Sequence, residues 1–250
     1  MKVSIITAVF NGAATIEHCI NSVRAQTYAD IEHIIVDGNS KDGTLEIISK
    51  YQDGETKIIS EPDNGIYDAM NKGIMHSTGD IIGILNSDDF YPDNSVIEKV
   101  VCIMSKKNAD SCYGDAVYVK RTNFKKIVRY WKGGQFSRSK FRIGWMPQHG
   151  TFYVKKSIYM KYGLFRNDFP IAADYELMLR FLYKHRIRTT YLPEILLKVC
   201  TGGISRPGIL NTSKMFIENY RAWKVNGFKF PLLACCSKRL LKIPQYIIRP

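Results

Sequence analysis

The stretch Ile81-Ile82-Gly83-Ile84-Leu85-Asn86-Ser87-Asp88-Asp89 decides the fold of this chain. Its apolar, β-branched start predicts a buried strand, and its Asn, Ser and Asp residues mark the end of that strand. Two adjacent carboxylates resist joint ionisation unless a cation neutralises them. Oxygen ligands suit Mg²⁺ or Mn²⁺ better than Zn²⁺. For an isolated Asp-Asp pair, the alternative is an Asp-rich turn that caps the next helix.

Length and composition indicate a globular protein. A chain of 250 residues with 45% hydrophobic residues can form one large α/β domain, or one domain with an appendage. The six cysteines form no Cys-x-x-Cys pair, so we expect reduced thiols and a cytoplasmic protein. The apolar start ends at Asn11-Gly12 without a cleavage site, which predicts a strand rather than a signal peptide. No stretch approaches the roughly 18–20 apolar residues of a membrane-spanning helix.

The net charge of +13 is unevenly distributed along the chain. Residues 1–100 carry 7 Lys and Arg against 16 Asp and Glu, whereas residues 101–250 carry 29 against 7. A basic second half suits nucleic acid, an anionic membrane surface or a phosphorylated substrate. Charge alone leaves these three partners open.

Strands and helices alternate through the first 90 residues. Predicted strands at 3–10, 33–36, 56–60 and 81–85 end in turn residues, and helical periodicity follows each of the first three. Short connections in this order predict a mostly parallel central sheet flanked by helices. Because ligands bind beyond the carboxyl ends of such strands, the strand-end residues are expected at one edge. These residues are Phe10, Asp37, Glu61 and Asp88-Asp89.

The alternation ends after residue 100. The pattern predicts a helix over 95–106, strands over 111–119 and 125–131, a basic loop over 136–144, and a strand that emerges from a Pro-containing turn within 145–154. A helix over 174–182 follows, with Asp174 in its first turn. The helix dipole favours an acid there, so a purely structural role is the alternative for Asp174. Likewise, Asp37 could simply cap the second helix.

The absence of several nucleotide-binding and nucleic-acid-binding sequence motifs reduces the number of functional classes that fit this chain. No Gly-x-Gly-x-x-Gly follows the first strand and no Gly-x-x-x-x-Gly-Lys-Ser/Thr occurs, so dinucleotide-binding and P-loop functions lose their main support. A sugar nucleotidyltransferase would be expected to have a Gly-rich, basic phosphate loop after the first strand, where residues 10–14 read Phe-Asn-Gly-Ala-Ala. A nucleic-acid-binding protein would use the basic half, but the first half is acidic and no recognition motif occurs.

Six stretches together carry a family resemblance: Val3 to Asn11, Ile34 to Thr44, Asp63 to Gly73, Leu85 to Asp89, Gln148 to Phe152, and Ala173 to Arg180. In this order and spacing they resemble the inverting family 2 glycosyltransferases with the GT-A fold, in their bacterial polysaccharide-assembly branch. The resemblance extends to about residue 205. It implies a nucleotide-sugar-binding half over 1–92, a smaller acceptor and catalytic-base half over 93–205, and a basic, amphipathic, helical C-terminal extension over 206–250.

The resemblance also implies roles at the donor site. Thr7, Ala8 and Phe10 would line the nucleoside pocket, Asp37 would bind the base, Asp68 would abut the donor, Asp88 would reach the ribose, and Asp89 would hold Mn²⁺ or Mg²⁺. Asn86 or Ser87 stands where many members have a further Asp. The metal would therefore depend more on the diphosphate oxygens of the donor, for which a UDP-sugar is favoured.

On the acceptor side, the resemblance implies that Asp174 is the general base that takes the proton of the attacking hydroxyl. Ala173 stands where the family often has Glu. A metal at Asp89 would act as a Lewis acid on the departing diphosphate. The acceptor would be a glycan or a polyprenyl-diphosphate-linked molecule in cell-surface polysaccharide synthesis. Trp145 and His149 are acceptor-binding candidates, with structural packing as the alternative for both.

The C-terminal part is basic and partly apolar. From Ile195 onward there are ten Lys and Arg and one acid, Glu218, interleaved with aromatic and aliphatic residues. This composition suits an interfacial segment on the anionic inner face of the plasma membrane. Such a segment would bring the enzyme to a lipid-linked acceptor. A helix that packs on the domain with a basic outer face is the alternative.

Overall fold

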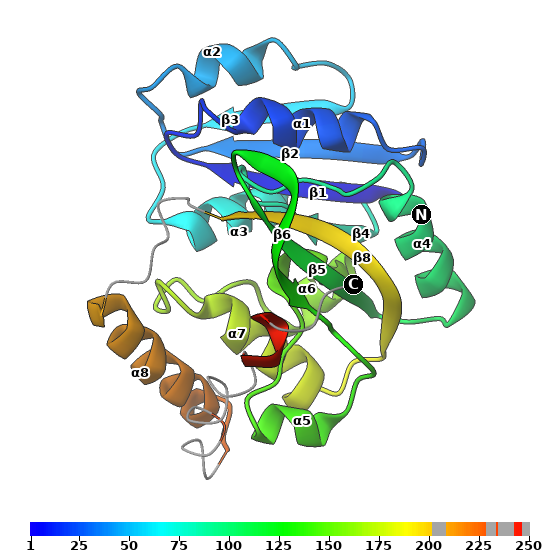
Figure 1. Ribbon diagram of the computed structural model, residues 1–250, viewed down its shortest axis with the longest axis vertical. Helices are drawn as coiled ribbons and strands as arrows, with labels where there is room; N and C mark the ends of the chain where they lie inside the picture. The colour runs from blue at the N-terminus through cyan, green and yellow to red at the C-terminus, as the bar shows by residue number, and fades with distance from the viewer. Residues whose placement is uncertain (202–208, 229–233, 235–242, 247–250) are drawn as a thin grey trace.

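A computed structural model describes residues 1–201, 209–228, 234 and 243–246. It shows a mixed α/β fold in which helices flank a central eight-stranded sheet (Figure 1). The first half contributes the parallel strands β1 (Val3–Val9), β2 (Ile31–Asp37), β3 (Thr56–Ser60) and β4 (Ile81–Ile84). They pair in the order β3-β2-β1-β4. The predicted fold class is confirmed, because the short apolar runs form strands buried between two helical layers.

The second half extends the same sheet with β5 (Ser111–Lys120), β6 (Asn123–Trp131), β7 (Tyr153–Lys155) and β8 (Thr189–Thr201). Strand β7 is antiparallel to both β4 and β5, so β5 runs in the same direction as β4. The carboxyl end of β5 therefore lies at the same sheet edge as those of β1 and β4. Strand β6 pairs antiparallel with β5, and the long, unpredicted β8 pairs parallel with it.

Helices cover both faces of the sheet (Figure 1). On one face lie α1 (Ile16–Arg24), α2 (Thr44–Ser49) and α4 (Val96–Lys106), and on the other lie α3 (Ile66–His76), α6 (Lys156–Tyr162) and α7 (Ala173–Met178). Successive β1 side chains point to opposite faces of the sheet and pack in different hydrophobic cores. Ile5 packs with residues of α1 and α4, and Ile6 packs with residues of α3. A Cβ at Gly73 would lie 2.3 Å from Ile6 Cγ2, so this glycine lets α3 approach the sheet closely.

Three local predictions for the second half need correction. The expected loop over 136–144 contains the short helix α5 (Arg138–Arg142). A 3-10 turn, η1 (His149–Thr151), precedes β7 within the expected strand region. The helix expected over 174–182 begins at Ala173 and continues as the π-helix η2 (Leu179–Lys184). Short segments of this kind carry too few periods for their type to be read from the sequence.

Two described helical segments lie in the C-terminal part, α8 (Ile209–Val225) and η3 (Ile243–Tyr246). Helix α8 packs on α7, and Trp223 Nε1 donates to Tyr175 Oη at 2.8 Å. The packed-helix alternative therefore describes α8. Positions 202–208, 229–233, 235–242 and 247–250 of the predicted extension lie outside the described residues. Every helix in the described part of the chain is too short or too polar to cross a bilayer.

Candidate active site

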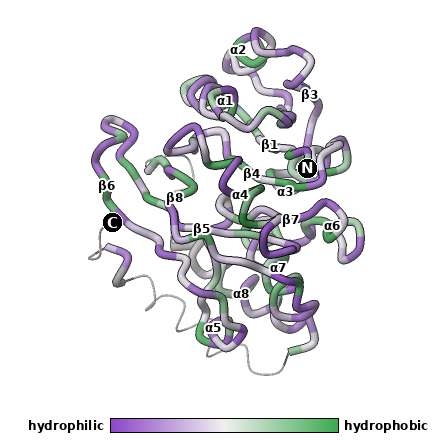
Figure 2. Tube along the Cα trace, turned by 90° about the vertical axis from the view of Figure 1, so that its right-hand side faces the viewer, coloured by the Kyte–Doolittle hydropathy of each residue, from purple (hydrophilic) through white to green (hydrophobic). Residues whose placement is uncertain are grey.

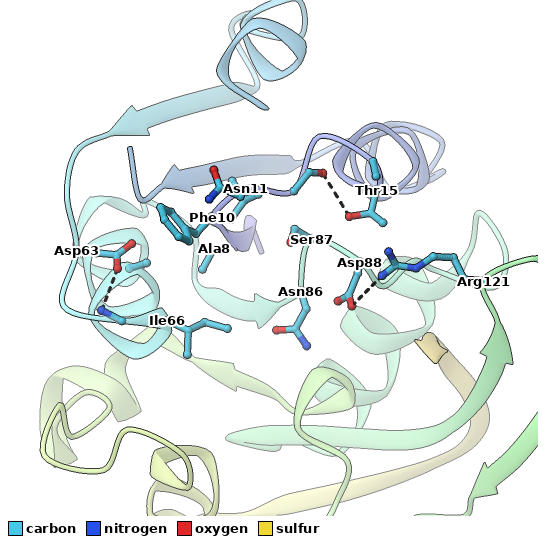
Figure 3. Close-up of a pocket in the computed structure, with 15 residues that line it drawn as sticks. Ala8, Phe10, Asn11, Thr15, Asp63, Ile66, Asn86, Ser87, Asp88 and Arg121 are labelled. Atoms are coloured by element: carbon cyan, nitrogen blue, oxygen red, sulfur yellow. Dashed lines mark hydrogen bonds and ion pairs between the residues drawn. The ribbon is translucent and has the colours of Figure 1, made fainter. Parts of the chain in front are cut away.

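A cavity of about 440 Å³ opens at the carboxyl ends of β1 and β4 (Figure 3). The loops after β1, β3 and β4, the start of α3 and the turn after β5 form its walls. Its described lining residues are Ala8, Val9, Phe10, Asn11, Gly12, Ala14, Thr15, Asp63, Gly65, Ile66, Ala69, Asn86, Ser87, Asp88 and Arg121. Residues far apart in sequence meet here because strands that run in the same direction end at the same edge.

The loop after β2 braces the loop after β1. Backbone N–H groups of the β1 loop donate to three side chains of the β2 loop: Asn11 N to Ser40 Oγ (2.8 Å), Gly12 N to Thr44 Oγ1 (2.9 Å) and Ala13 N to Asp42 Oδ2 (3.0 Å). This bracing fixes the loop that carries Phe10, whose side chain is 61% exposed and lines the cavity. An exposed aromatic ring at a cavity offers a face on which a flat ligand can stack.

The structure separates the predicted nucleoside-binding residues. Ala8 and Phe10 line the cavity, whereas Thr7 and Asp37 do not. The hydroxyl of the fully buried Thr7 lies 2.9 Å from His33 Nε2. It also lies 3.8 Å from Cys19 Sγ, so it is on the side of the sheet that α1 covers. Asp37 is also fully buried, and its carboxylate accepts hydrogen bonds from the hydroxyls of Ser40 and Ser60. Because Asp37 is fully buried, contact between its carboxylate and a base in this cavity would require neighbouring side chains to move.

The acid that lines the cavity near α3 is Asp63 in the loop before this helix, and not the predicted Asp68 in its first turn. Asp68 accepts from the backbone N–H of Asn64 at 3.0 Å and lies 3.6 Å from Lys72 Nζ, outside the cavity lining. Asp63 lines the cavity instead, with its Oδ1 accepting from Gly65 N at 2.9 Å. Sequence reasoning missed Asp63, although its position just after the third predicted strand was a usable signal.

The side chains of Asp88 and Asp89, in the turn after β4, point in different directions. Asp88 faces the cavity and lies 3.6 Å from Arg121 (Figure 3). Asp89 is 2% exposed and absent from the described lining, and its carboxylate accepts from Cys200 N and Asn86 Nδ2, both at 3.1 Å. Burial raises the pKa of both carboxyls, and the charge of Asp88 raises that of Asp89 further. Of the two carboxylates, Asp88 is the one that faces the cavity, and the assignment of the metal to Asp89 stays a prediction.

The oxygen donors near Asp88 fit a hard cation only in part. Asn86 and Ser87 also line the cavity, and their side chains add an amide oxygen and a hydroxyl. Within the described ranges, no three His, Cys, Asp or Glu side chains are arranged to hold a metal ion. Mg²⁺ is commonly bound through one or two carboxylates plus substrate phosphates, so a donor set of this size suits an ion shared with a bound diphosphate.

A second cluster links α3 to α7. The hydroxyl of Tyr67, next to the cavity residue Ile66, lies 3.0 Å from Ile171 O and 3.4 Å from Asp174 Oδ1. Asp174 Oδ1 also accepts from Tyr175 N at 2.7 Å. Both ring nitrogens of His149 are buried without a protein partner. Burial lowers the pKa of His149, and the negative charge of Asp174 opposes this effect.

The described cavity lining does not include Asp37, Asp89 or Asp174, so the placement of these three carboxylates around one nucleotide-sugar site stays a prediction. Trp145 also has a packing role. It is half-buried, its Nε1 donates to Gly133 O at 3.0 Å, and its ring lies edge-on to Phe141. Strand-end position alone could not predict which way each side chain points.

The comparisons with known proteins agree with this architecture. The profile of the family described as "Glycosyl transferase family 2" matches residues 4–168. The chain belongs to the family 2 glycosyltransferases. Membership decides for a transferase over the nucleotidyltransferase and the nucleic-acid-binding protein that the sequence alone left open.

Relatives and solved structures support the same assignment. An uncharacterized glycosyltransferase of Mycobacterium tuberculosis is 36% identical over 181 residues, which cover 71% of this chain and 68% of that protein. S. aureus TarS 1–349 in complex with UDP-GlcNAc has a TM-score of 0.69 at 15% identity, over 96% and 70% of the two chains. The mannosyltransferase PcManGT from Pyrobaculum calidifontis, in complex with GDP-Man and Mn²⁺, has a TM-score of 0.67 at 19% identity, over 98% and 70%. At these identities the two structures establish the shared fold.

Proposed function

We propose that this glycosyltransferase moves a sugar, with inversion, from a nucleotide-diphospho-sugar to a hydroxyl of a glycan or lipid-linked acceptor. The observation that carries the proposal is the cavity at the sheet edge. It has exposed apolar side chains, Phe10 and Ile66, and a carboxylate–guanidinium pair, Asp88 and Arg121. A nucleoside diphosphate has matching chemistry, because its base is flat and stackable and its diphosphate is anionic.

Asp88, with Asn86 and Ser87, would hold Mn²⁺ or Mg²⁺ against the donor diphosphate. The bound metal supplies Lewis acidity to the leaving phosphate oxygens. The position of the Asp88 carboxylate supports this role, because it faces the cavity and is partly exposed, so that a cation there can reach it. PcManGT, which shares the fold, is seen in complex with GDP-Man and Mn²⁺.

Asp174 would act as the general base. The start of α7 and the Tyr67 hydroxyl hold its carboxylate. In one displacement, the acceptor oxygen forms a bond to the anomeric carbon while the bond from that carbon to the diphosphate oxygen breaks. The hydroxyl proton moves to Asp174, and the nucleoside diphosphate leaves with the bonding electrons. One displacement inverts the anomeric centre, so no covalent sugar–enzyme intermediate is required.

Calorimetric titration with UDP, GDP and dTDP, with and without Mn²⁺, tests the donor assignment. We expect one of these nucleotides to bind and Mn²⁺ to strengthen its binding. Asp174→Asn should leave this affinity nearly unchanged, because Asp174 lies outside the cavity lining. If none of the three nucleotides binds with Mn²⁺ present, the proposed function is wrong.

A further inference from the structure

We propose that Arg121 binds the second phosphate of the donor diphosphate, the one that carries the sugar, and that it exchanges its ion pair with Asp88 for the oxygens of this phosphate. This inference rests on the proposed function and assigns a specific ligand contact to it. Arg121 comes directly after β5, in the turn that leads into β6. It reaches the cavity because β5 ends at the same sheet edge as β1 and β4.

The contact between Arg121 and Asp88 is suited to exchange. Arg121 Nη2 lies 3.6 Å from Asp88 Oδ2, and the two side chains are 39% and 35% exposed. Exposed ion pairs of this kind contribute little to stability, so breaking this one has a small cost. The guanidinium group points into the cavity toward Asp88 (Figure 3). Its planar set of N–H donors matches two phosphate oxygens at once.

The charges of the lining residues make Arg121 the candidate cation for an anionic ligand. Among the described lining residues, Asp63 and Asp88 carry negative charge and Arg121 alone carries positive charge. A divalent ion held at Asp88 would offset the two carboxylates, and the Arg121 guanidinium would then face the diphosphate. Lys72, on nearby α3, is engaged elsewhere, because its Nζ lies 3.0 Å from Glu61 and 2.7 Å from Pro62 O.

The surroundings of Arg121 favour an anionic ligand. Residues 116–167 contain 13 Lys and Arg and no Asp or Glu. Lys120, Lys125 and Lys126 are exposed on the same β5–β6 hairpin, which projects from the body of the molecule (Figure 2). A positive field of this kind draws anions such as a nucleoside diphosphate toward the cavity. Arg121 therefore lies at the cavity, beside Asp88, where an incoming phosphate can reach its guanidinium group.

Paired titrations with UMP and UDP, or with GMP and GDP if the guanine nucleotides bind, test this inference in the presence of Mn²⁺. We expect Arg121→Ala to weaken binding of the diphosphate by about 10- to 100-fold, the range of a lost charge-assisted contact. Binding of the monophosphate should change by less than about threefold, since the lost contact is to the second phosphate. Arg121→Lys should fall between wild type and Arg121→Ala, because it keeps the charge and loses the planar donor pair.

Lys125→Ala is the matched control, because it removes the same charge from the same hairpin at a position outside the lining. It should leave both affinities close to those of the wild type. Equal weakening of monophosphate and diphosphate binding by Arg121→Ala, or no weakening of either, would overturn the role of Arg121. An equal loss in Lys125→Ala would also overturn it, because the effect would then come from the general field. Failure of the wild-type protein to bind any nucleoside diphosphate would instead contradict the proposed function.

Discussion

Asp88 and Asp89 illustrate how much depends on the direction of one side chain. The Asp88 carboxylate is available to ligands, whereas that of Asp89 connects the end of β4 to the backbone of Cys200 in β8. We expect Asp89→Ala to lower the free energy of unfolding by about 1–3 kcal/mol, because it leaves a buried N–H without an acceptor. Asp88→Ala should change it by no more than about 0.5 kcal/mol. Urea unfolding of both variants measures this difference.

The same two variants separate stability from binding. Asp88→Ala should abolish the strengthening of nucleoside diphosphate binding by Mn²⁺, whereas Asp89→Ala should retain it while folded. If calorimetry shows that Asp89→Ala, but not Asp88→Ala, loses the strengthening by Mn²⁺, then Asp89 is the metal ligand. The exposure of Asp88 to the cavity is the reason for the expectation.

Asp174 and Tyr67 are expected to affect turnover rather than donor binding. Asp174→Asn should lower kcat by about 10²–10⁴-fold, the usual contribution of a general base. Tyr67→Phe should lower kcat by a smaller factor, because it removes a hydroxyl that helps to hold the Asp174 carboxylate. Steady-state kinetics at saturating donor measure both effects. Turnover of Asp174→Asn at the wild-type rate would show that another group is the base.

At the scale of elements, α8 stabilises the start of α7. The Glu218 carboxylate is buried and accepts from Ile171 N at 3.0 Å and Ala172 N at 2.8 Å, just before the helix that carries Asp174. We expect Glu218→Ala to lower the free energy of unfolding by about 1–3 kcal/mol, because two N–H groups lose a charged acceptor. Thermal unfolding beside the exposed control Lys214→Ala measures this. Equal melting temperatures would contradict the bracing role.

Glu32 connects β2 to β1 and to the turn before β4. Burial acts to raise its pKa, but hydrogen bonds from Ser4 and Thr78, with the charge of Lys2, lower it to about 2. A lowered carboxyl pKa stabilises the fold above the unfolded value of about 4.3, and this contribution is lost as pH falls toward 2. We expect Glu32→Gln to lose less stability than the wild type between about pH 5 and about pH 2. Parallel acid-unfolding curves would contradict this.

At the scale of the whole molecule, an acidic first half and a basic second half share one sheet. We propose that the basic C-terminal part attaches the enzyme to an anionic membrane surface, where a lipid-linked acceptor would lie. The described α8 exposes Lys214 and Lys224, together with Ile217, whereas its exposed Arg221 pairs with Asp168. This composition suits an anionic bilayer surface, although α8 also packs on α7.

Sedimentation with vesicles tests the membrane proposal. Vesicles that contain anionic phosphatidylglycerol should bind the protein at low salt, and high salt should release most of it, because screening weakens surface charge interactions. Neutral phosphatidylcholine vesicles are the control. A protein that stays in the supernatant with anionic vesicles at low salt would rule the proposal out.

The sequence by itself determined the parallel half of the sheet and the edge where the cavity lies. The apolar runs at 3–10, 33–36, 56–60 and 81–85 each end in turn residues, and short connections leave parallel pairing as the consistent arrangement. Local patterns therefore sufficed to predict that ligand-binding residues follow these strands. Phe10 and Asp88 were predicted at this edge, and the structure places both in the cavity lining.

Only the tertiary structure decided which side chains face the cavity. Asp37 and Asp89 follow strands as predicted, but both carboxylates bind protein donors inside the fold. Arg121 enters the cavity because β7 inserts antiparallel between β4 and β5, which orients β5 in the direction of β4. That pairing joins segments more than 30 residues apart, so no local pattern contains it. The direction of a side chain at a strand end depends on such partners, because a buried carboxylate turns toward whatever donors the fold brings near it.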